Sequence, residues 1–444
     1  MNSANLARLL GGNGTCMTHA QKLALATAML VCAGMWLYVD RVLIAHQKAE
    51  SASRRIPRGN LSDLYPRWLG SRELLLRHRD PYSPEITREI QTGYYGRPLD
   101  RALKNDPTDQ QAFAYPVYVA FLLAPTVKLP FPAVQALFRW ILAGLTVISV
   151  AVWLRVIRWR MSAITTITLM LLIFSTFPVV QGIKLQQLTL LVAPLIAGSI
   201  FCLVRGRLVA AGVLLALATI KPQITAPLVA WLLLWGLSAP SLRWRFVASF
   251  FSMITVLIVS GELLLPGWMH EFVRAVTAYL GYNGTRTLLD GLLTRDVAVP
   301  VEAMLFVLTG VTCWKARRVP AWDEEFYWTT SLVLAVTVLV IPSIAPYNQL
   351  LLLPGVFLVL RSWNRLLRVN AAVRVARGAA GVFTVWSWIS AGILVIESFF
   401  TLGAQRYWML PLWASIVMPF LLALCLVLLI YFPPRPPPSA LDNS

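Results

Sequence analysis

The sequence predicts an all-α polytopic membrane protein of about twelve transmembrane helices, with a long first outer loop that carries amphipathic juxtamembrane helices. Hydrophobic residues make up 57% of the 444 residues and charged residues only 13%, whereas about a quarter of a soluble domain is charged. Apolar runs close to the length that crosses a bilayer recur along the whole chain. The basic residues punctuate the gaps between these runs, so the net charge of +19 indicates membrane topology rather than nucleic-acid binding.

The predicted spans follow one another from the N-terminus. The first apolar run follows a polar stretch of about twenty residues, so we interpret it as a retained span and not as a cleaved signal peptide. Residues 1–436 are expected to form one integral-membrane domain, and the Pro-rich residues 437–444 a disordered cytoplasmic tail. The apolar segments lie near 23–45, 131–154, 163–180, 187–203, 207–220, 222–238, 246–265, 298–314, 326–342, 348–362, 378–400 and 407–431.

Residues 112–128 form one further apolar segment, which is short and broken by Pro116 and Pro125. If this segment does not cross, the cytoplasmic gaps hold sixteen lysines and arginines and the short outer loops six. If it did cross, this balance would reverse and violate the positive-inside rule. We therefore expect a re-entrant or membrane-surface helix here, within an outer loop that spans 46–130. The basic residues of this loop do not argue against that placement, because long loops translocate largely regardless of charge.

This topology brings unusual polar residues from distant segments to one face of the membrane, as a functional site would. The group comprises Asp63, Asp80, Tyr115, Lys184, Gln186, Gln187, Lys221, Tyr347 and Asn348.

Asp63 precedes an amphipathic helix that we expect to lie on the bilayer, since Trp68 and Leu69 recur seven residues later as Leu75 and Leu76. The carboxylate has two interpretations. It is either a helix N-cap or a general base that takes a proton from an attacking hydroxyl.

Other charged residues of the outer loop have structural explanations. Asp80 stands in an Asp-Pro pair typical of turns, and we rank it below Asp63. The arginines suit anionic lipid headgroups, although one or two of them are candidates to bind a phosphate; they are Arg67, Arg72, Arg77 and Arg79.

Lys221 interrupts an apolar stretch of some thirty residues and is followed by Pro222. The two flanking segments are at or below spanning length, which predicts a hairpin with its tip below the outer surface. The ammonium either snorkels to the headgroups or meets an anion in a cavity. Lys184 lies in a similar setting among glutamines, whose amides suit sugar hydroxyls.

Several motifs are absent from the sequence. The chain has no Walker A, GxGxxG-helix, HExxH or GxSxG motif, and no DxD motif. Its five cysteines form no CxxC pair and its four histidines are isolated, so we expect neither a metal site nor a cofactor. An enzyme built this way would use a donor other than a nucleotide sugar, and a lipid phosphate fits a site at the outer face.

Four stretches together carry a family resemblance. They are "SDLYPRWLGSRELLLRHRDPYSPE", "FAYPVYVAFLLAP", the segment from "QGIKLQQLTLL" to "LATIKP", and "IAPYNQLLLLPG". In order and spacing the chain resembles the GT-C superfamily of integral-membrane glycosyltransferases, and within it glycosyltransferase family 87, the polyprenyl-phosphate-mannose-dependent mannosyltransferase-like proteins. One departure is Val117, where the family often has a second proline after Tyr115.

The resemblance implies a GT-C-like fold and transfer, with inversion, of a hexose such as mannose from a polyprenyl-phosphate donor. The reaction would take place on the non-cytoplasmic face of the cell membrane, and the acceptor would be a glycolipid, glycan or protein. Relatives that use arabinofuranosyl donors leave the sugar open. Asp63 is then the catalytic residue, and the donor phosphate would contact Lys221, Lys184 and Arg67. The expected substrate-binding residues are Asp80, Tyr82, Tyr115, Gln186, Gln187, Tyr347 and Asn348.

A lipid-linked sugar flippase or secondary transporter is the alternative, because broken helices and many spans also describe transporters. The halves of the chain show no similarity to each other, and the outer loop carries an acid, which favours the transferase.

Overall fold

The computed structural model describes residues 17–54, 56, 62–100, 102–103, 105–284, 286–342, 344–362, 371–401 and 403–431. These residues form helices joined by turns, and no strand occurs among them. The all-α prediction is therefore confirmed. The predicted disordered tail, 437–444, lies outside the described residues.

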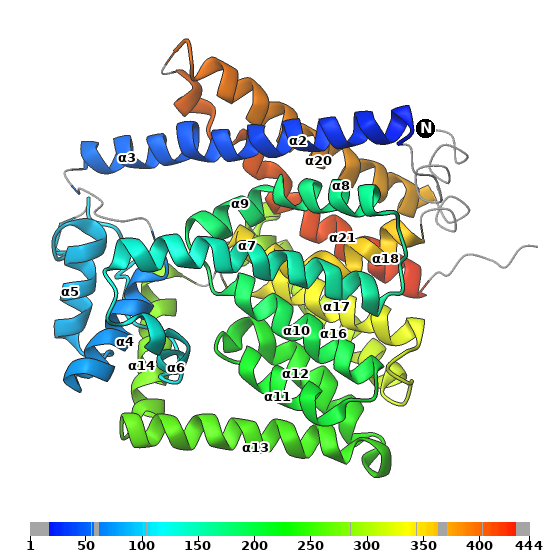
Figure 1. Cartoon of the computed structure of the whole chain (residues 1–444), viewed down its shortest axis with the longest axis horizontal. Coiled ribbons are helices and arrows are strands. Elements are labelled where there is room, and N and C mark those ends of the chain that lie inside the picture. Colours follow the sequence, from blue (N-terminus) through cyan, green and yellow to red (C-terminus); the bar gives the residue numbers. More distant parts are fainter. Residues whose placement is uncertain are drawn as a thin grey trace, which may run out of the picture.

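A long rod forms the N-terminal part of the described chain, along one side of the bundle (Figure 1). It consists of α2 (His19–Tyr38), the π-helical turn η1 (Val39–Leu43) and α3 (Ile44–Ser53). The side chain of Thr18 caps the start of α2 in a capping box with Gln21, which satisfies backbone N–H groups that would otherwise lack partners. The rod packs against α8 and α20, and η1 places Asp40 close to α9.

A cap of short helices covers one end of the bundle, at the left of Figure 1. It contains α4 (Tyr65–Arg77), α5 (Pro84–Tyr95), α6 (Val119–Leu123) and α14 (Trp268–Asn283). The amphipathic α4 forms as expected, but its apolar side, with Trp68 and Leu74, is buried inside the protein. The helix therefore packs against the bundle and does not simply rest on lipid.

Residues 112–128 form no spanning helix. They contain α6 and the 3₁₀ turn η2 (Ala124–Thr126), which together cover eight residues and are too short to cross a bilayer. Tyr115 and Val117 of this segment are buried, and the indole of Trp68 donates a hydrogen bond to the carbonyl of Thr126 at 3.2 Å. The segment thus joins α4 to the bundle.

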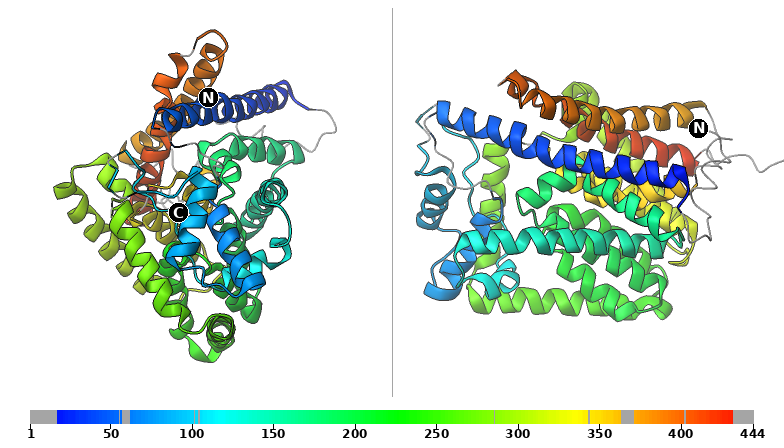
Figure 2. Two further views of the ribbon diagram at one scale, coloured as in Figure 1. Left: turned by 90° about the vertical axis from the view of Figure 1, so that its left-hand side faces the viewer. Right: turned by 45° about the horizontal axis from the view of Figure 1, so that its top comes forward.

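The remaining helices form the bundle itself, seen from two further directions in Figure 2. One apolar core of buried side chains runs from α4 to α21. The elements are α7 (Phe131–Val156), α8 (Ala163–Phe174), α9 (Phe177–Lys184), α10 (Thr189–Val204), α11 (Leu208–Ala218), α12 (Pro222–Leu237), α13 (Pro240–Leu264), α15 (Leu288–Leu292), α16 (Arg295–Ala316), α17 (Glu324–Val340), η3 (Pro346–Leu352), α18 (Leu353–Arg361), α20 (Ala371–Glu397), η4 (Gly403–Tyr407), η5 (Leu410–Leu412) and α21 (Trp413–Tyr431).

Six helical segments of the described chain are long and apolar enough to cross a membrane, or seven if the bent pair α8 and α9 counts as one span. This is the architecture of a multi-pass membrane protein, but the predicted count of twelve is not confirmed. Hydropathy marks every apolar run, whereas crossing also needs length. Helices α10, α11 and α12 have only 16, 11 and 16 residues.

The break predicted at Lys221 is present, between the end of α11 at Ala218 and the start of α12 at Pro222. Proline is well suited to the first position of a helix but cannot continue the preceding one. Helix α11 packs against α13, which has 25 residues. Because a helix rises about 1.5 Å per residue, α11 is much shorter than its neighbour, and its turn with α12 lies recessed within the bundle.

Candidate active site

The side chain of Gln187 stands at the centre of the candidate site. Its Nε2 donates a hydrogen bond to Oδ2 of Asp63, and its Oε1 accepts one from Nζ of Lys221 at 3.3 Å. Gln187 follows α9 in a tight turn where Gln186 has a φ of 50°, a left-handed conformation that few side chains adopt. The side-chain amide of Gln187 therefore binds both Asp63, from the outer loop, and Lys221, from the α11–α12 turn.

The carboxylate of Asp63 does not cap a helix. Leu64 is the N-cap residue of α4, and no side chain caps the helix. The backbone N–H of Asp63 donates to the carbonyl of Leu185 at 2.9 Å, which fixes the acid beside the α9–α10 turn. Burial raises the pKa of Asp63 above its ordinary value, with Arg67 and then the Gln187 hydrogen bond acting in the opposite direction. The carboxylate therefore takes up a proton more readily than an exposed aspartate does.

Lys221 is buried, with 5% of its surface exposed. Its Nζ donates to Oγ1 of Thr189 at 2.6 Å and lies 3.4 Å from Oδ1 of Asn348. It also lies 4.9 Å from the centre of the Tyr347 ring. The snorkelling alternative is wrong, since the ammonium is enclosed by these neutral groups. Within the described chain, no carboxylate comes within ion-pair distance of it.

Arg67 brings a second cation to Asp63. Its guanidinium donates to the Asp63 carbonyl at 2.6 Å and lies 4.6 Å from the centre of the Tyr115 ring. Its Nε is buried and has no hydrogen-bond partner among the described residues. Two cations, Arg67 and Lys221, therefore approach the acid from different elements.

Lys184 is not brought to this cluster. Its ammonium forms an ion pair with Asp40 of η1, at 2.6 and 2.7 Å to the two carboxylate oxygens, and faces the ring of Trp36. The pair joins the N-terminal rod to α9. Asp40 is not among the residues predicted from the sequence, because an acid at the end of an apolar run normally marks only the membrane boundary.

Three other predicted substrate-binding residues make structural contacts. Asp80 accepts a hydrogen bond from the backbone N–H of Tyr82 at 2.9 Å, the contact expected of a turn. The hydroxyl of Tyr82 donates to the carbonyl of Tyr115 at 2.6 Å. Gln186 is buried, and its amide donates to the carbonyls of Ile183 and Lys184 at 2.9 and 2.5 Å. These contacts are structural and lie outside the hydrogen bonds that Gln187 makes to Asp63 and Lys221.

The remaining arginines in and directly after α4 also have protein partners. Arg77 and Arg79 both pair with the buried Glu73, and Arg72 lies over the ring of Trp68. These contacts hold the cap together.

Thr189, the first residue of α10, is also not among the residues predicted from the sequence. Its hydroxyl accepts from Lys221 and donates to Asn348 at 2.9 Å. Threonine is common in apolar helices, so its type gave no signal. Its place directly after "QGIKLQQL" was the available clue.

Among the residues that the structure describes, no three of His, Cys, Asp and Glu gather as a metal site would require. The described cluster is thus made of one carboxylate, two cations, amides, a hydroxyl and aromatic rings.

Comparison with known families decides the class of the protein. A family model for glycosyltransferase family 87 matches residues 113–342, which is just over half of the chain. The chain belongs to glycosyltransferase family 87. This enzyme is therefore a membrane glycosyltransferase, with a sugar donor and an acceptor. The search of curated proteins and the search of solved structures gave no match.

The matched range divides the candidate site of this family 87 protein. It includes Gln187, Thr189 and Lys221, whereas Asp63 and Arg67 precede it and Asn348 follows it. The family match therefore does not include Asp63, which remains a candidate on its geometry.

Proposed function

We propose that the protein transfers mannose from a polyprenyl-phosphate donor to an acceptor hydroxyl, with inversion, on the non-cytoplasmic face of the cell membrane. The observation that supports this most directly is the buried ammonium of Lys221, which has neutral partners but no carboxylate within ion-pair distance in the described chain. A buried cation is costly unless an anion joins it. The donor phosphate supplies that anion.

The proposed reaction is a direct displacement at the anomeric carbon. The acceptor oxygen attacks from the face opposite the phosphate, and a new C–O bond forms as the bond to the phosphate oxygen breaks. Asp63 takes the acceptor's proton, and the bonding electrons leave with the polyprenyl phosphate. Lys221 and Arg67 stabilise the charge that develops on this leaving group, in surroundings of low dielectric constant.

Gln187 has a defined part in this proposal. By binding Asp63 through Nε2 and Lys221 through Oε1, it fixes the spacing between the base and the phosphate-binding cation. Fixed spacing lowers the barrier because the reacting groups need less reorganisation. Transfer is preferred to the flippase alternative because the chain belongs to a glycosyltransferase family.

The decisive experiment uses purified protein, polyprenyl-phosphate-mannose and a panel of glycolipid, glycan and peptide acceptors. The wild type is expected to form a mannosylated product, and Asp63→Asn to lower the rate by about 10²- to 10⁴-fold. Lys221→Met is expected to cost about a hundredfold. Asp80→Asn is the matched control, because Asp80 serves a turn; its rate should stay within a few-fold of wild type. Unimpaired transfer by Asp63→Asn would remove the base assignment, and unimpaired transfer by Lys221→Met the phosphate assignment.

A further inference from the structure

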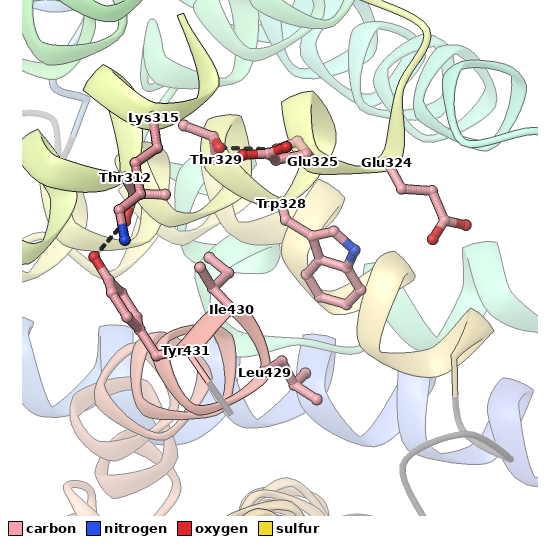
Figure 3. Close-up of a pocket in the computed structure, with 9 residues that line it drawn as sticks. All are labelled: Thr312, Lys315, Glu324, Glu325, Trp328, Thr329, Leu429, Ile430 and Tyr431. Atoms are coloured by element: carbon pink, nitrogen blue, oxygen red, sulfur yellow. Dashed lines mark hydrogen bonds between the residues drawn. The ribbon is translucent and has the colours of Figure 1, made fainter. Parts of the chain in front are cut away.

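A cavity of about 310 Å³ opens where α16 ends, α17 begins and α21 ends (Figure 3). This junction lies at the end of the bundle opposite the cap formed by α4, α5 and α6 (Figure 1). The cavity is thus separate from the cluster around Gln187. None of the contacts described for the transfer reaction involves it.

Charged residues of both signs line this cavity. Lys315 lies at one side, with its ammonium 5.6 Å from the centre of the Tyr431 ring. Glu324 lies at the other side, with the indole of Trp328 between them (Figure 3). In the described chain no ion pair joins Lys315 to Glu324 or Glu325; Glu324 instead lies 3.9 Å from Arg361. The space between the charges suits a ligand that carries both signs at its two ends.

The cavity also lies where membrane spans end. Helix α16 and the segment that contains α21 are both candidate spans, and they end at Ala316 and Tyr431. Tryptophan and tyrosine are typical of the membrane–water interface. Leu429 and Ile430 add an apolar wall on the α21 side. A ligand in this cavity would have charged protein groups around its head and apolar side chains beside its tail. A phospholipid has this combination of a charged headgroup and apolar chains.

We propose that this cavity binds the phosphoethanolamine headgroup of a membrane phospholipid. The phosphate would meet the ammonium of Lys315, beside the hydroxyls of Thr312 and Tyr431, which lie 3.0 Å apart and both donate to the carbonyl of Leu308. The primary ammonium would donate hydrogen bonds to Glu325 and face the indole of Trp328. A choline headgroup has no N–H to donate to a carboxylate, and a purely anionic headgroup would face the carboxylate of Glu325.

The test uses the full-length protein in nanodiscs of phosphatidylcholine, with or without phosphatidylethanolamine. Phosphatidylethanolamine is expected to raise Tm by a few degrees, because a ligand that binds only the folded state stabilises it. Native mass spectrometry should show a retained phosphatidylethanolamine adduct, with about tenfold weaker retention in Glu325→Gln and in Lys315→Met. Lys22→Met is the matched control, since Lys22 is exposed on α2 and lines no part of this cavity. It should behave as wild type.

Three results would overturn the proposal. One is equal stabilisation by phosphatidylcholine alone, which would show that the ammonium hydrogen bonds are not recognised. A second is undiminished retention in both cavity variants. The third is a full Tm shift with soluble glycerophosphoethanolamine, which would assign the cavity to a soluble compound instead of a lipid.

Discussion

At the scale of single residues, the site depends on charges held away from water. Asp63 shows how the fold biases a proton equilibrium, since burial raises its pKa while the proposed mechanism requires its ionised form. Burial of Asp63 therefore disfavours the ionised carboxylate that the proposed mechanism needs. Such conflicts between stability and activity are common at functional sites.

The pH dependence of transfer should reflect this conflict. A base with a raised pKa becomes protonated at a higher pH than an ordinary aspartate, whose pKa is about 3.9. We expect kcat/KM to fall as the pH decreases through this raised value. Rate measurements across the acidic range will test this, and the residual activity of Asp63→Asn should lack the same dependence.

Stability should respond in the opposite sense. Because the folded-state pKa is above the unfolded one, the contribution of Asp63 to stability is present at low pH and is lost as the pH rises through the folded pKa. Asp63→Asn should therefore raise Tm at pH 7 and change it little near pH 4. Thermal unfolding at both values measures this. A lower Tm at pH 7 would contradict the stated direction of the pKa shift.

Thr189 makes the shortest hydrogen bond to Lys221, and we infer that it positions the ammonium. Thr189→Val should reduce the transfer rate about tenfold, since a misplaced charge stabilises the leaving group less well. Thr189→Ser keeps the hydroxyl and should restore the rate, which a purely structural role for the methyl group would not allow.

At the scale of elements, the close contact between α11 and α13 positions the turn that carries Lys221. A Cβ at Gly212 would lie 2.5 Å from the Phe246 carbonyl oxygen and 2.8 Å from the Phe250 nitrogen. Both are backbone atoms and cannot move aside, so only glycine allows this approach.

Gly212→Leu should separate α11 from α13, lower Tm and reduce transfer together. Gly144→Leu on α7 is the matched control, because nothing lies within 4 Å of a Cβ there. Thermal unfolding and rates of both variants measure the effect. An unchanged Tm for Gly212→Leu would show that this contact does not hold the helices together.

Much of the element pattern could be predicted from the sequence. Apolar periodicity located the helices, and Pro222 marked the break after α11. What could not be predicted was how far each helix reaches, because hydropathy is insensitive to the tertiary packing that sets helix ends. The Gln187 contact to Asp63 was equally hidden, although each residue was chosen as a candidate. The contact between Gln187 and Asp63 depends on a left-handed backbone conformation at Gln186. Glycine is the usual sequence signal for this conformation, and position 186 does not carry it.

At the scale of the whole molecule, the two ends of the bundle differ in character. The cap with α4 and α5 lies at one end, and the α16–α17 junction with Lys315 at the other (Figure 1). Under the proposed topology, the first end is outside the cell and the second is cytoplasmic, in agreement with the basic residues near the second end.

Cysteine labelling tests this orientation. With the native cysteines replaced by serine, Glu85→Cys on α5 should react with an impermeant maleimide in intact cells. Arg318→Cys, beyond the end of α16, should react only after permeabilisation. Both side chains are exposed, so the side of the membrane on which each cysteine lies decides whether the maleimide reaches it. Reversed labelling would place the Asp63 cluster on the cytoplasmic side.

The origin of the two key groups in separate parts of the chain also matters for engineering. Asp63 lies in a segment that precedes the family-matched range, whereas Lys221 lies within that range. Chimeras that exchange residues 46–112 between homologues but keep Arg67 should therefore alter which acceptor is glycosylated and leave donor choice intact. Selectivity for the two substrates can then diversify separately within one scaffold.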